Sequence, residues 1–363
     1  MMNDKIRAYV DAAKLDTTNI AEDMVDIYHA LLENQGTELQ RVAEQTTTAN
    51  IDRVATVFLP AIKKLARDSI INKIVGVQPI PDRVAIVQFL DYVYTGAAVD
   101  QSGGAISAGA SVIDNVSLAY SNDPGEGQNI TSTIDFVLRE EGVKARQRKL
   151  AGKWTFEAGD ATSKLGINVE AEITKALSSK IVEETNFEVL NDLYVKATGS
   201  TTLSWTAPLA GDAPDVKTRK EKELYYVIVD AAAEMYNKTR RYPNFVVCNP
   251  KVAAYFKRTG EYVGPTAEKG QVSMLKRLFL AGTLNDEFAM YVVPNLATNK
   301  LLLGYKGNSE IEVGGIYAPY IPLIVMDSFY NVENWSWIRS VGSFYAKSYP
   351  MTDLYGTVTV NFS

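Results

Sequence analysis

The chain has 363 residues, of which 46% are hydrophobic, so it is long enough to bury a substantial core. Its formal net charge of -6 argues against a dedicated nucleic-acid-binding protein, which would carry a basic surface. The single cysteine, Cys248, excludes an internal disulfide. No apolar run is long enough for a transmembrane helix, and the amino-terminal segment lacks the apolar core of a signal peptide, so we expect a protein made in the cytoplasm.

The first 50 residues are acidic and favour helix. Apolar residues recur at steps of three and four from Ile20 to Leu32, and Gly36 is expected to end this helix. A second amphipathic pattern follows over residues 51–74. The amino-terminal arm holds too few apolar residues for a core of its own. We therefore expect it either to dock on another part of the protein or to remain mobile.

A long excursion is expected in the next part of the chain. Residues 84–94 are rich in β-branched and aromatic side chains, which predicts a buried strand. Residues 95–133 are rich in Gly, Ser and Ala, with one strand-like segment at 112–120. Strand-like alternation returns over 130–138 and 143–150. We expect a two-stranded loop with a flexible tip, and a loop of this length is usually functional.

Residues 151–193 are the most strongly patterned part of the chain. A strand edge is expected near residues 153–158, followed by a short helix that Gly166 ends and a long helix that Asn168 caps. At ~1.5 Å per residue, a helix of about 26 residues spans ~40 Å. Periodicity alone leaves two interpretations open, an ordinary core helix or a rigid support for other elements. Its apolar positions are Val169, Ile173, Ala176, Leu177, Ile181, Phe187, Leu190 and Tyr194.

The remaining elements alternate between helix and strand and then become mostly strand, which makes the fold class α+β. After a linker-like stretch, the patterns predict a helix over 218–241, a short buried strand at 243–250, a helix over 251–260, strands at 288–294 and 300–307, and strands over most of 310–363.

Residues that carry catalysis or bind cofactors are scarce. His29 is the only histidine, so neither a zinc site nor a serine–histidine–aspartate triad is expected. Cys248 lies in an apolar run and is expected to pack as a small hydrophobic residue. The phosphate-binding pattern GxxxxGK[ST] is absent. We therefore expect no catalytic residues, no cofactor and no metal, and a protein that is not an enzyme.

Residues 139–153 form a basic stretch in an otherwise acidic chain. One interpretation is a solvated strand face, and the other is an arm that lies against an acidic surface of a neighbouring subunit. The candidate basic contacts are Arg139, Lys144, Arg146, Arg148, Lys149 and Lys153. The acidic residues that the long helix offers are Glu170, Glu172, Glu183, Glu184 and Glu188.

Four stretches, residues 75–96, 141–190, 239–256 and 302–324, resemble the major capsid proteins of tailed bacteriophages, and are most similar to the T-even-like myovirus lineage. This resemblance implies the Hong Kong 97-type fold. Its expected parts are an N-terminal arm (1–60), a peripheral domain with a long spine helix (61–94, 154–217 and 311–363), an extended loop (95–153) and an axial domain (218–310).

The same resemblance implies a structural function. The expected protein assembles with itself into hexamers, and also pentamers if it fills the vertices, in an icosahedral or elongated virion shell. The implied partners are scaffold, portal, vertex and decoration proteins, together with packaged double-stranded DNA bound without sequence specificity, and no membrane. The alternatives are an encapsulin-type shell with enzyme cargo, a vertex protein that forms only pentamers, and an unrecognised enzyme.

Relatives of this kind often lose an amino-terminal segment to a maturation protease that cuts after a glutamate in an apolar-x-Glu context. Glu33 and Glu44 have that context in this sequence. An uncleaved arm that remains part of the structure is the other expectation.

Overall fold

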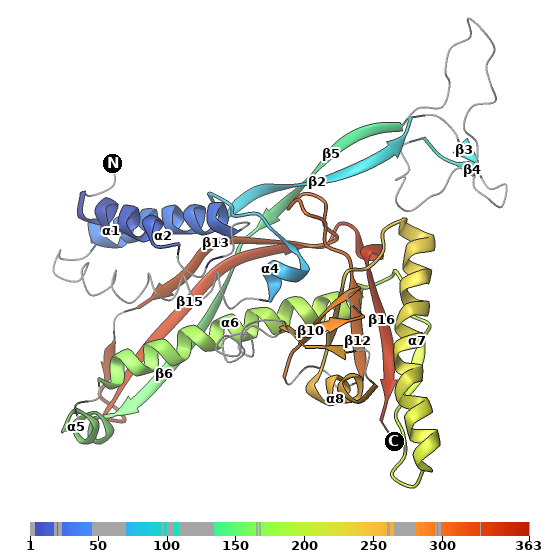
Figure 1. Ribbon diagram of the computed structural model, residues 1–363. Coiled ribbons are helices and arrows are strands. Elements are labelled where there is room, and N and C mark those ends of the chain that lie inside the picture. Colours follow the sequence, from blue (N-terminus) through green and yellow to red (C-terminus); the bar gives the residue numbers. More distant parts are fainter. Residues whose placement is uncertain are drawn as a thin grey trace, which may run out of the picture.

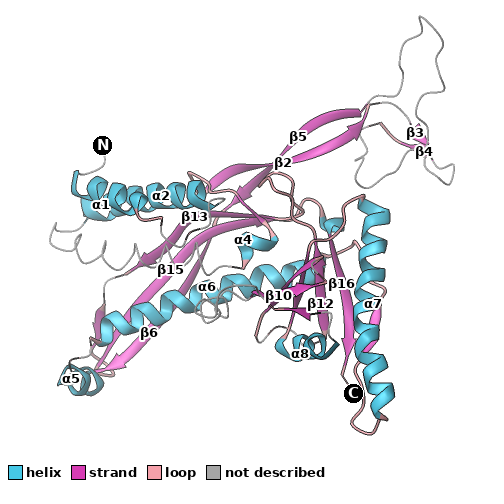
Figure 2. Cartoon of the chain, viewed as in Figure 1, coloured by secondary structure: helices cyan, strands magenta, loops and turns pink. Residues whose placement is uncertain are grey.

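The computed structural model describes residues 4–17, 20, 24–45, 70–95, 98–99, 105–108, 134–164, 166, 168–259, 262–264, 280–285, 287–294, 296, 299–326 and 328–362. Helices and strands are both abundant, which confirms the α+β class (Figure 2). Three expectations lie outside the described residues: most of the helix over 51–74, the strand at 112–120, and the helix end at Gly260.

The helices are α1 (Asp4–Leu15), α2 (Val25–Gln45), α4 (Ile71–Ile74), α5 (Phe156–Lys164), α6 (Val169–Lys196), α7 (Pro214–Thr239), α8 (Pro250–Thr259) and the 3-10 helix η3 (Thr352–Leu354). The strands are β1 (Gly76–Val77), β2 (Val84–Tyr94), β3 (Ala98–Val99), β4 (Ala105–Ile106), β5 (Ile134–Lys144), β6 (Arg146–Thr155), β7 (Ser204–Thr206), β8 (Phe245–Cys248), β9 (Tyr262–Val263), β10 (Leu280–Leu284), β11 (Phe288–Val292), β12 (Lys300–Gly304), β13 (Ile316–Val325), β14 (Phe329–Asn331), β15 (Ser336–Ser348) and β16 (Tyr355–Asn361).

One sheet lies along the long helix α6. Its strand order is β1-β13-β15-β14, with β6 paired to β15. Figure 1 shows α6 running beside β6 and β15 over most of their length. The helix buries Ile181, Leu190 and Leu193 in a core shared with β13 and β15. The spine arrangement expected from the sequence is therefore present in the structure.

A seven-stranded sheet forms the second layer, in the order β7-β16-β12-β8-β11-β10-β9. Successive residues of β12 face opposite sides, as strand geometry requires. Leu301 and Leu303 pack in the core that α7 and α8 cover. Leu302 packs on the other side, in the core shared with α6. The centre of the seven-stranded sheet is therefore buried on both faces, and Leu302 joins it to the core shared with α6.

The two strands β2 and β5 form an antiparallel hairpin that projects from the rest of the protein (Figure 1). The prediction that residues 84–94 are a buried strand was wrong, because Val84 and Ile86 are 67% and 61% exposed. β-branched and aromatic content indicates a strand but does not indicate which layers cover it. The excursion also begins earlier than the predicted loop over 95–153, at β2, while β6 lies in the sheet beneath α6.

The amino-terminal arm docks on the sheet, one of the two outcomes expected for it. Leu31 and Leu32 of α2 are buried, and the Asn34 amide donates to the backbone oxygens of Ile80 (3.0 Å) and Tyr320 (3.1 Å). The expected helix end at Gly36 was wrong, because α2 continues to Gln45. Tertiary packing of α2 offsets the cost of about 1 kcal/mol for a mid-helix glycine.

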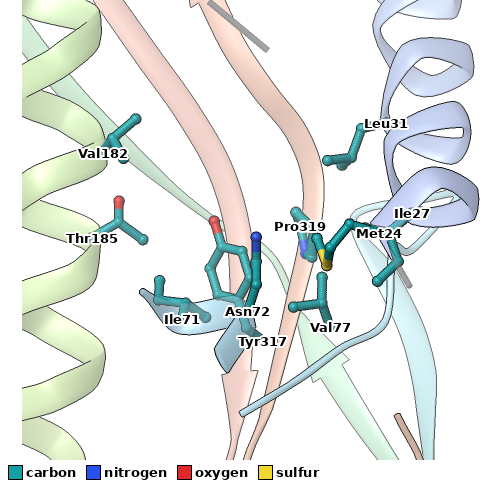
Figure 3. A pocket seen from close by; sticks show the side chains of 10 residues that line it. All are labelled: Met24, Ile27, Leu31, Ile71, Asn72, Val77, Val182, Thr185, Tyr317 and Pro319. Atoms are coloured by element: carbon teal, nitrogen blue, oxygen red, sulfur yellow. The ribbon is translucent and has the colours of Figure 1, made fainter. Parts of the chain in front are cut away.

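The seam between α2, α6 and β13 is tightly closed. Figure 3 shows Leu31 of α2 and Met24, which directly precedes α2, on one side of Tyr317 of β13, with Thr185 of α6 on the other side. The space that they and their neighbours enclose is about 10 Å³. That is barely the room needed for one water molecule. The arm is thus an integral part of the core in this structure.

The ends of α6 agree with the sequence. Gly166 has a φ of +74°, the left-handed conformation expected where a short helix ends. The Asn168 side chain accepts a hydrogen bond from the Ala171 amide at 3.2 Å, which confirms the cap. Two details differ from expectation. Phe156 begins α5 instead of extending a strand, and Ala176 is exposed instead of lying on the buried face.

Polar side chains complete the buried face of α6. The hydroxyls of Thr174, Ser178 and Thr185 are buried, and each donates to the backbone oxygen four residues earlier, at 2.7, 2.7 and 2.8 Å. A buried hydroxyl that is satisfied within its own helix costs little, so these residues pack as small side chains.

Candidate assembly surfaces

An apolar surface lies on one face of the β2–β5 hairpin. Residues directly opposite in an antiparallel pair share a face, so the partners Leu90 and Leu138, and Tyr92 and Phe136, lie on the same side. The large hydrophobic residues exposed on this face are Val84 (67%), Ile86 (61%), Ile134 (47%), Phe136 (63%) and Leu138 (42%). We call these five residues the hairpin face. An exposed cluster of this kind marks an interaction site.

The opposite face of the hairpin is held by internal contacts. Val87, Val93 and Val143 are buried there. Arg139 Nε lies 2.8 Å from Asp91 Oδ2, and only 4% of the Asp91 side chain is exposed. Arg139, a predicted contact to a neighbour, is therefore engaged within its own hairpin. It serves to neutralise a buried carboxylate there.

Arg148 is also engaged within its own chain. Its Nε donates to Glu188 Oε2 of α6 at 2.9 Å, and Lys347 Nζ and the Tyr345 hydroxyl reach the same carboxylate at 2.6 and 2.5 Å. Lys347 also pairs with Asp192. We call this group the Glu188 clamp. It ties α6 to β6 and β15.

The clamp changes the acidity of its members. Burial raises the pKa of Glu188, but hydrogen bonds from Arg148, Lys347 and Tyr345 outweigh it and lower the pKa to about 2. Burial and the hydrogen bond to Glu188 raise the pKa of Tyr345 to about 12. The clamp is therefore charged, and its tyrosine neutral, at every physiological pH.

A second contact fixes the other end of α6. Glu170 pairs with Arg339 of β15 and accepts from Ser328 Oγ at 3.0 Å. The helical distance from Glu170 to Glu188 is about 27 Å at ~1.5 Å per residue. The strand distance from Arg339 to Lys347 is about 26 Å at ~3.3 Å per residue. Helix and strand are thus matched in length between the two contacts.

The other predicted contacts divide into two groups. Glu172 and Glu183 lie near lysines of their own helix, at 3.9 Å from Lys175 and 3.0 Å from Lys180. Exposed pairs of this kind contribute roughly 0–1 kcal/mol. The second group is exposed and forms no ion pair with any described residue; it comprises Lys144, Arg146, Lys149, Lys153 and Glu184. Contact with a neighbouring subunit stays a prediction for these five.

The sequence-based list missed Arg339, Tyr345 and Lys347 of β15. Each lies more than 150 residues from its glutamate along the chain, so no local spacing connects them. The pairing of β6 with β15 brings them together. Only the sheet register, which the local pattern does not specify, would have identified them.

The two predicted cleavage positions lie on α2. Glu33 pairs with Lys14 at 2.6 Å, and the preceding Leu31 and Leu32 are 2% and 0% exposed. Glu44 lies in the last turn of the same helix. A protease needs an extended backbone, so cleavage after Glu33 requires this part of α2 to undock and unwind first. Cleavage at either position stays a prediction.

His29 and Cys248, the only histidine and the only cysteine of the sequence, both lie in ordinary structural environments. His29 Nε2 lies 3.1 Å from the backbone oxygen of Lys14, and burial raises the pKa of the Cys248 thiol to about 12. Within the described ranges, no group of three or more His, Cys, Asp and Glu side chains is placed to hold a metal ion. No described helix is long and apolar enough to cross a membrane.

The chain is similar in sequence to major capsid proteins of bacteriophages. The chain is 25% identical to the major capsid protein of Vibrio phage KVP40 over 67% of this chain and 49% of that protein. It is 25% identical to the major capsid protein of Enterobacteria phage T4 over 55% of this chain and 42% of that protein. The chain thus spans about half the length of the curated relatives it matches.

Among solved structures, the chain is similar to one from Microbacterium phage Oxtober96, with a TM-score of 0.47 and 10% identity over 81% of this chain and 91% of that chain. It is also similar to the capsid of Myoviridae Phage XM1, with a TM-score of 0.43 and 10% identity over 79% of this chain and 89% of that chain.

Residues 97–334 match the family described as Major capsid protein Gp23. The docked arm, projecting hairpin, long helix on a five-stranded sheet and seven-stranded sheet correspond to the parts expected from the resemblance to the Hong Kong 97-type fold. Because the match extends over more than half of the sequence, the chain belongs to the Gp23 major capsid protein family.

Proposed function

We propose that the chain is a structural subunit of a bacteriophage capsid that assembles with copies of itself into a closed shell around double-stranded DNA. Membership of the Gp23 family supports this function. The subunit is made in the host cytoplasm and ends in the virion. Its role is structural, and it acts by binding other subunits.

The hairpin face is the observation that carries this proposal. Phe136, Ile86 and their three neighbours are exposed on a projecting element, and no described residue covers them. Burying one such side chain against a partner contributes roughly 1.5–3 kcal/mol. A soluble monomer gains nothing from this surface, whereas a shell subunit gains a contact at every copy.

We assign a role to each predicted domain on the same basis. The projecting hairpin of β2 and β5 overlaps the adjacent subunit, and residues 218–310 cluster around the axis of each hexamer or pentamer. The net charge of -6 supports loose contact with packaged DNA, because phosphates are repelled by an acidic surface. Scaffold, portal, vertex and decoration proteins complete the set of proposed partners.

Electron microscopy and sedimentation of the purified full-length chain test the proposal. We expect shells or capsomer-sized rings from the unmodified protein. Replacing Ile86 and Phe136 together with serine should leave folded monomers. Val195→Ser is the matched control, because Val195 is 74% exposed but lies on α6, away from the hairpin. Its assemblies should be unchanged.

Two results would contradict the proposal: unmodified protein that stays monomeric at every concentration and salt, or serine variants that build normal shells. The contents of isolated particles separate the rival functions. Double-stranded DNA supports a capsid, whereas enzyme cargo supports an encapsulin. A copy number that matches the vertices alone supports a vertex protein.

A further inference from the structure

Three of the four tryptophans lie at one corner of the five-stranded sheet, where β6 ends beside α5 and the start of α6 (Figure 1). These are Trp154, Trp335 and Trp337, and each is at least partly exposed. The fourth, Trp205, is 2% exposed in the core that α7 covers. Tryptophan is a large apolar side chain with a polar N–H, so a surface group of three indicates a contact with a ligand or partner.

Trp154, Trp337 and Tyr330 form an aromatic row across three adjacent strands. Trp154 of β6 is the register partner of Trp337 of β15, and Trp337 is the partner of Tyr330 of β14. Directly opposed residues share one face of a sheet, so the three rings lie side by side. The ring centroids of Tyr330 and Trp337 are 5.2 Å apart. The row is on the α6 side of the sheet, because Gly152, two residues before Trp154, packs against Ile173 of that helix.

An open pocket of about 520 Å³ lies at this row. Trp154 and Trp337 line it from the sheet, Gly159 lines it from α5, and Asn168 and Glu170 line it from the start of α6. We call it the tryptophan pocket. A Cβ atom at Gly159 would lie 3.6 Å from Trp154 Cδ1 and 3.7 Å from Trp154 Nε1, so the glycine leaves the edge of that indole uncovered. A pocket of this size admits a small ligand.

The pocket holds hydrogen-bond donors that the protein does not use. The Nε1–H groups of Trp154 and Trp337 donate to no described residue. The Asn168 side chain accepts from the Ala171 amide through Oδ1, and its Nδ2 donates to no described residue. Apolar walls with a few convergent polar groups are the usual form of a small-molecule site.

Glu170 supplies an acceptor, and its side chain is 42% exposed. Ser328 and Arg339 both donate to Oε1, so Oε2 remains available to a ligand. Arg339 also balances the charge of Glu170, which favours a neutral ligand over an ionic one. Glu157 and Glu172 are exposed on the two flanking helices, and acidic residues at the mouth repel phosphate groups. A nucleotide is therefore disfavoured.

A pyranose sugar matches this combination of groups. When its hydroxyl groups are equatorial, its axial C–H groups form a flat apolar face that packs on an indole ring. The hydroxyl groups around its edge both donate and accept hydrogen bonds. Neighbouring strands are ~4.8 Å apart, which is close to the length of one sugar ring in an extended chain. Aromatic rings on adjacent strands are thus spaced to contact successive sugars.

We infer that the tryptophan pocket binds a neutral saccharide with equatorial hydroxyl groups, such as a β-linked glucose oligomer. Trp154 and Trp337 pack against the sugar rings, and Asn168 Nδ2 and Glu170 Oε2 bind the hydroxyl groups. This inference goes beyond the proposed function and does not depend on it. In a shell of many copies, weak sites of this kind would add up to firm attachment to a glycan-coated surface.

Titration of the purified chain with cellotriose tests the inference, with tryptophan fluorescence and saturation-transfer NMR as readouts. Sorbitol is the control ligand, because it offers the hydroxyl groups of a glucose unit without a ring face. Cellotriose should shift the tryptophan emission and receive saturation at its ring C–H groups, whereas sorbitol should do neither. Folded protein that binds no cellotriose, or that binds sorbitol equally well, would overturn the inference.

Two variants test the location of the site. Trp154→Ala removes one packing surface, and Gly159→Met fills the pocket while it keeps every indole. Each should weaken cellotriose binding by about tenfold or more, the loss typical of a central aromatic contact. Trp335→Asn is the matched control, because Trp335 does not line the pocket and asparagine tolerates its φ of +49°. Unchanged binding by Gly159→Met, or an equal loss in Trp335→Asn, contradicts the inference.

Asn168→Asp tests the polar contact without disturbing the helix. Aspartate caps a helix as well as asparagine does, so α6 stays intact while the Nδ2 donor is lost. Cellotriose binding should weaken several-fold with no change in thermal unfolding. If Trp154→Ala fails to fold, Gly159→Met and Asn168→Asp decide the question, and unchanged binding by both places the sugar elsewhere. A pocket that binds no sugar, but whose loss prevents assembly, belongs to a contact between subunits; that result overturns the inference and leaves the proposed function intact.

Discussion

The Arg148 guanidinium on β6 donates from Nε to Glu188 Oε2 on α6 across 2.9 Å. This contact lies within one subunit, although the charge pattern suggested that basic residues of this stretch reach a neighbour. Its consequence is mechanical. Strand β6, which carries the exposed lysines, is thereby fixed to α6, the helix that lies along the five-stranded sheet.

The Glu188 clamp should contribute to stability in a pH-dependent way. Glu188→Gln should lower the free energy of unfolding by about 1–3 kcal/mol at pH 7, because Arg148 and Lys347 lose a charged acceptor. The folded pKa of about 2 lies below the ordinary value of 4.5. The stabilisation is therefore complete above pH 4.5 and is lost as the pH falls toward 2.

Urea denaturation at pH 7 and at several lower pH values measures this difference. Glu184→Gln is the control, since Glu184 is exposed on the same helix and forms no ion pair with any described residue. The clamp account is wrong if Glu188→Gln and Glu184→Gln have the same free energy of unfolding at pH 7. It is also wrong if the difference between them remains as the pH falls toward 2.

Charge reversals should separate folding from assembly. Arg148→Glu should destabilise the monomer, because it places a second carboxylate beside Glu188. Arg146→Glu and Lys149→Glu should leave the unfolding midpoint within measurement error and reduce assembly. Thermal unfolding and sedimentation of the three variants test this distinction. If all three variants shifted the unfolding midpoint equally, the distinction between the internally engaged Arg148 and the exposed Arg146 and Lys149 would be wrong.

Gly152 fixes the distance between β6 and α6. A Cβ atom at this position would lie 2.6 Å from Ile173 Cγ2 and 3.2 Å from Leu177 Cδ1. Gly152→Ala should therefore destabilise the protein by about 1–3 kcal/mol. Combining it with Ile173→Ala should recover part of that loss, since the clashing methyl is gone. A double-mutant cycle in denaturant measures the coupling.

Gly142 provides the control for this substitution, because it lies in the same long strand and an added Cβ would meet nothing within 4 Å. Gly142→Ala should leave the unfolding midpoint nearly unchanged. If the changes in unfolding free energy caused by Gly152→Ala and Ile173→Ala were simply additive, the claim that contact with Ile173 sets the distance between β6 and α6 would be wrong.

The docked arm should protect Glu33 from proteolysis. A glutamate-specific protease should cut the folded monomer after Glu333, which is exposed in the turn between β14 and β15, well before it cuts after Glu33. Mass spectrometry of timed digests gives the order. Leu32→Ala should undock α2 and accelerate cleavage at Glu33. Equal rates at the two sites in the unmodified protein would mean that the arm does not stay docked.

The long helix should tolerate no break. Leu177→Pro removes a helical hydrogen bond and costs about 3 kcal/mol or more. It should abolish both folding and assembly, because α6 joins the two sheets. Ala176→Ser is the matched control, because Ala176 directly precedes Leu177 on the same helix and is exposed. Normal shells from Leu177→Pro protein would refute the role of α6 as a rigid support.

Local sequence patterns predicted where helices and strands lie better than they predicted how those elements pack against one another. The cap at Asn168 and the left-handed Gly166 were readable because the signals lie within a few residues of the helix ends they define. The end expected at Gly36 was wrong because packing of α2 on the sheet outweighed a local glycine signal. Helix propensity is a weak prior beside such packing.

The candidate surfaces depended on long-range pairing. The composition of residues 84–94 predicted a strand correctly, but not that the strand would have a single partner and one uncovered face. The basic stretch was visible in the sequence, yet which of its members are engaged internally depended on the register of β6 with β15. Arg148 and Lys149 are adjacent in sequence, and only the first faces Glu188.

Cryo-electron microscopy of the assembled particle tests the central claim most directly. The account predicts closed rings of subunits in which Ile86 and Phe136 of each hairpin are buried against the next subunit in one direction around the ring. A map in which the hairpin face remains in solvent, or in which the purified chain forms no ordered particle, would contradict it.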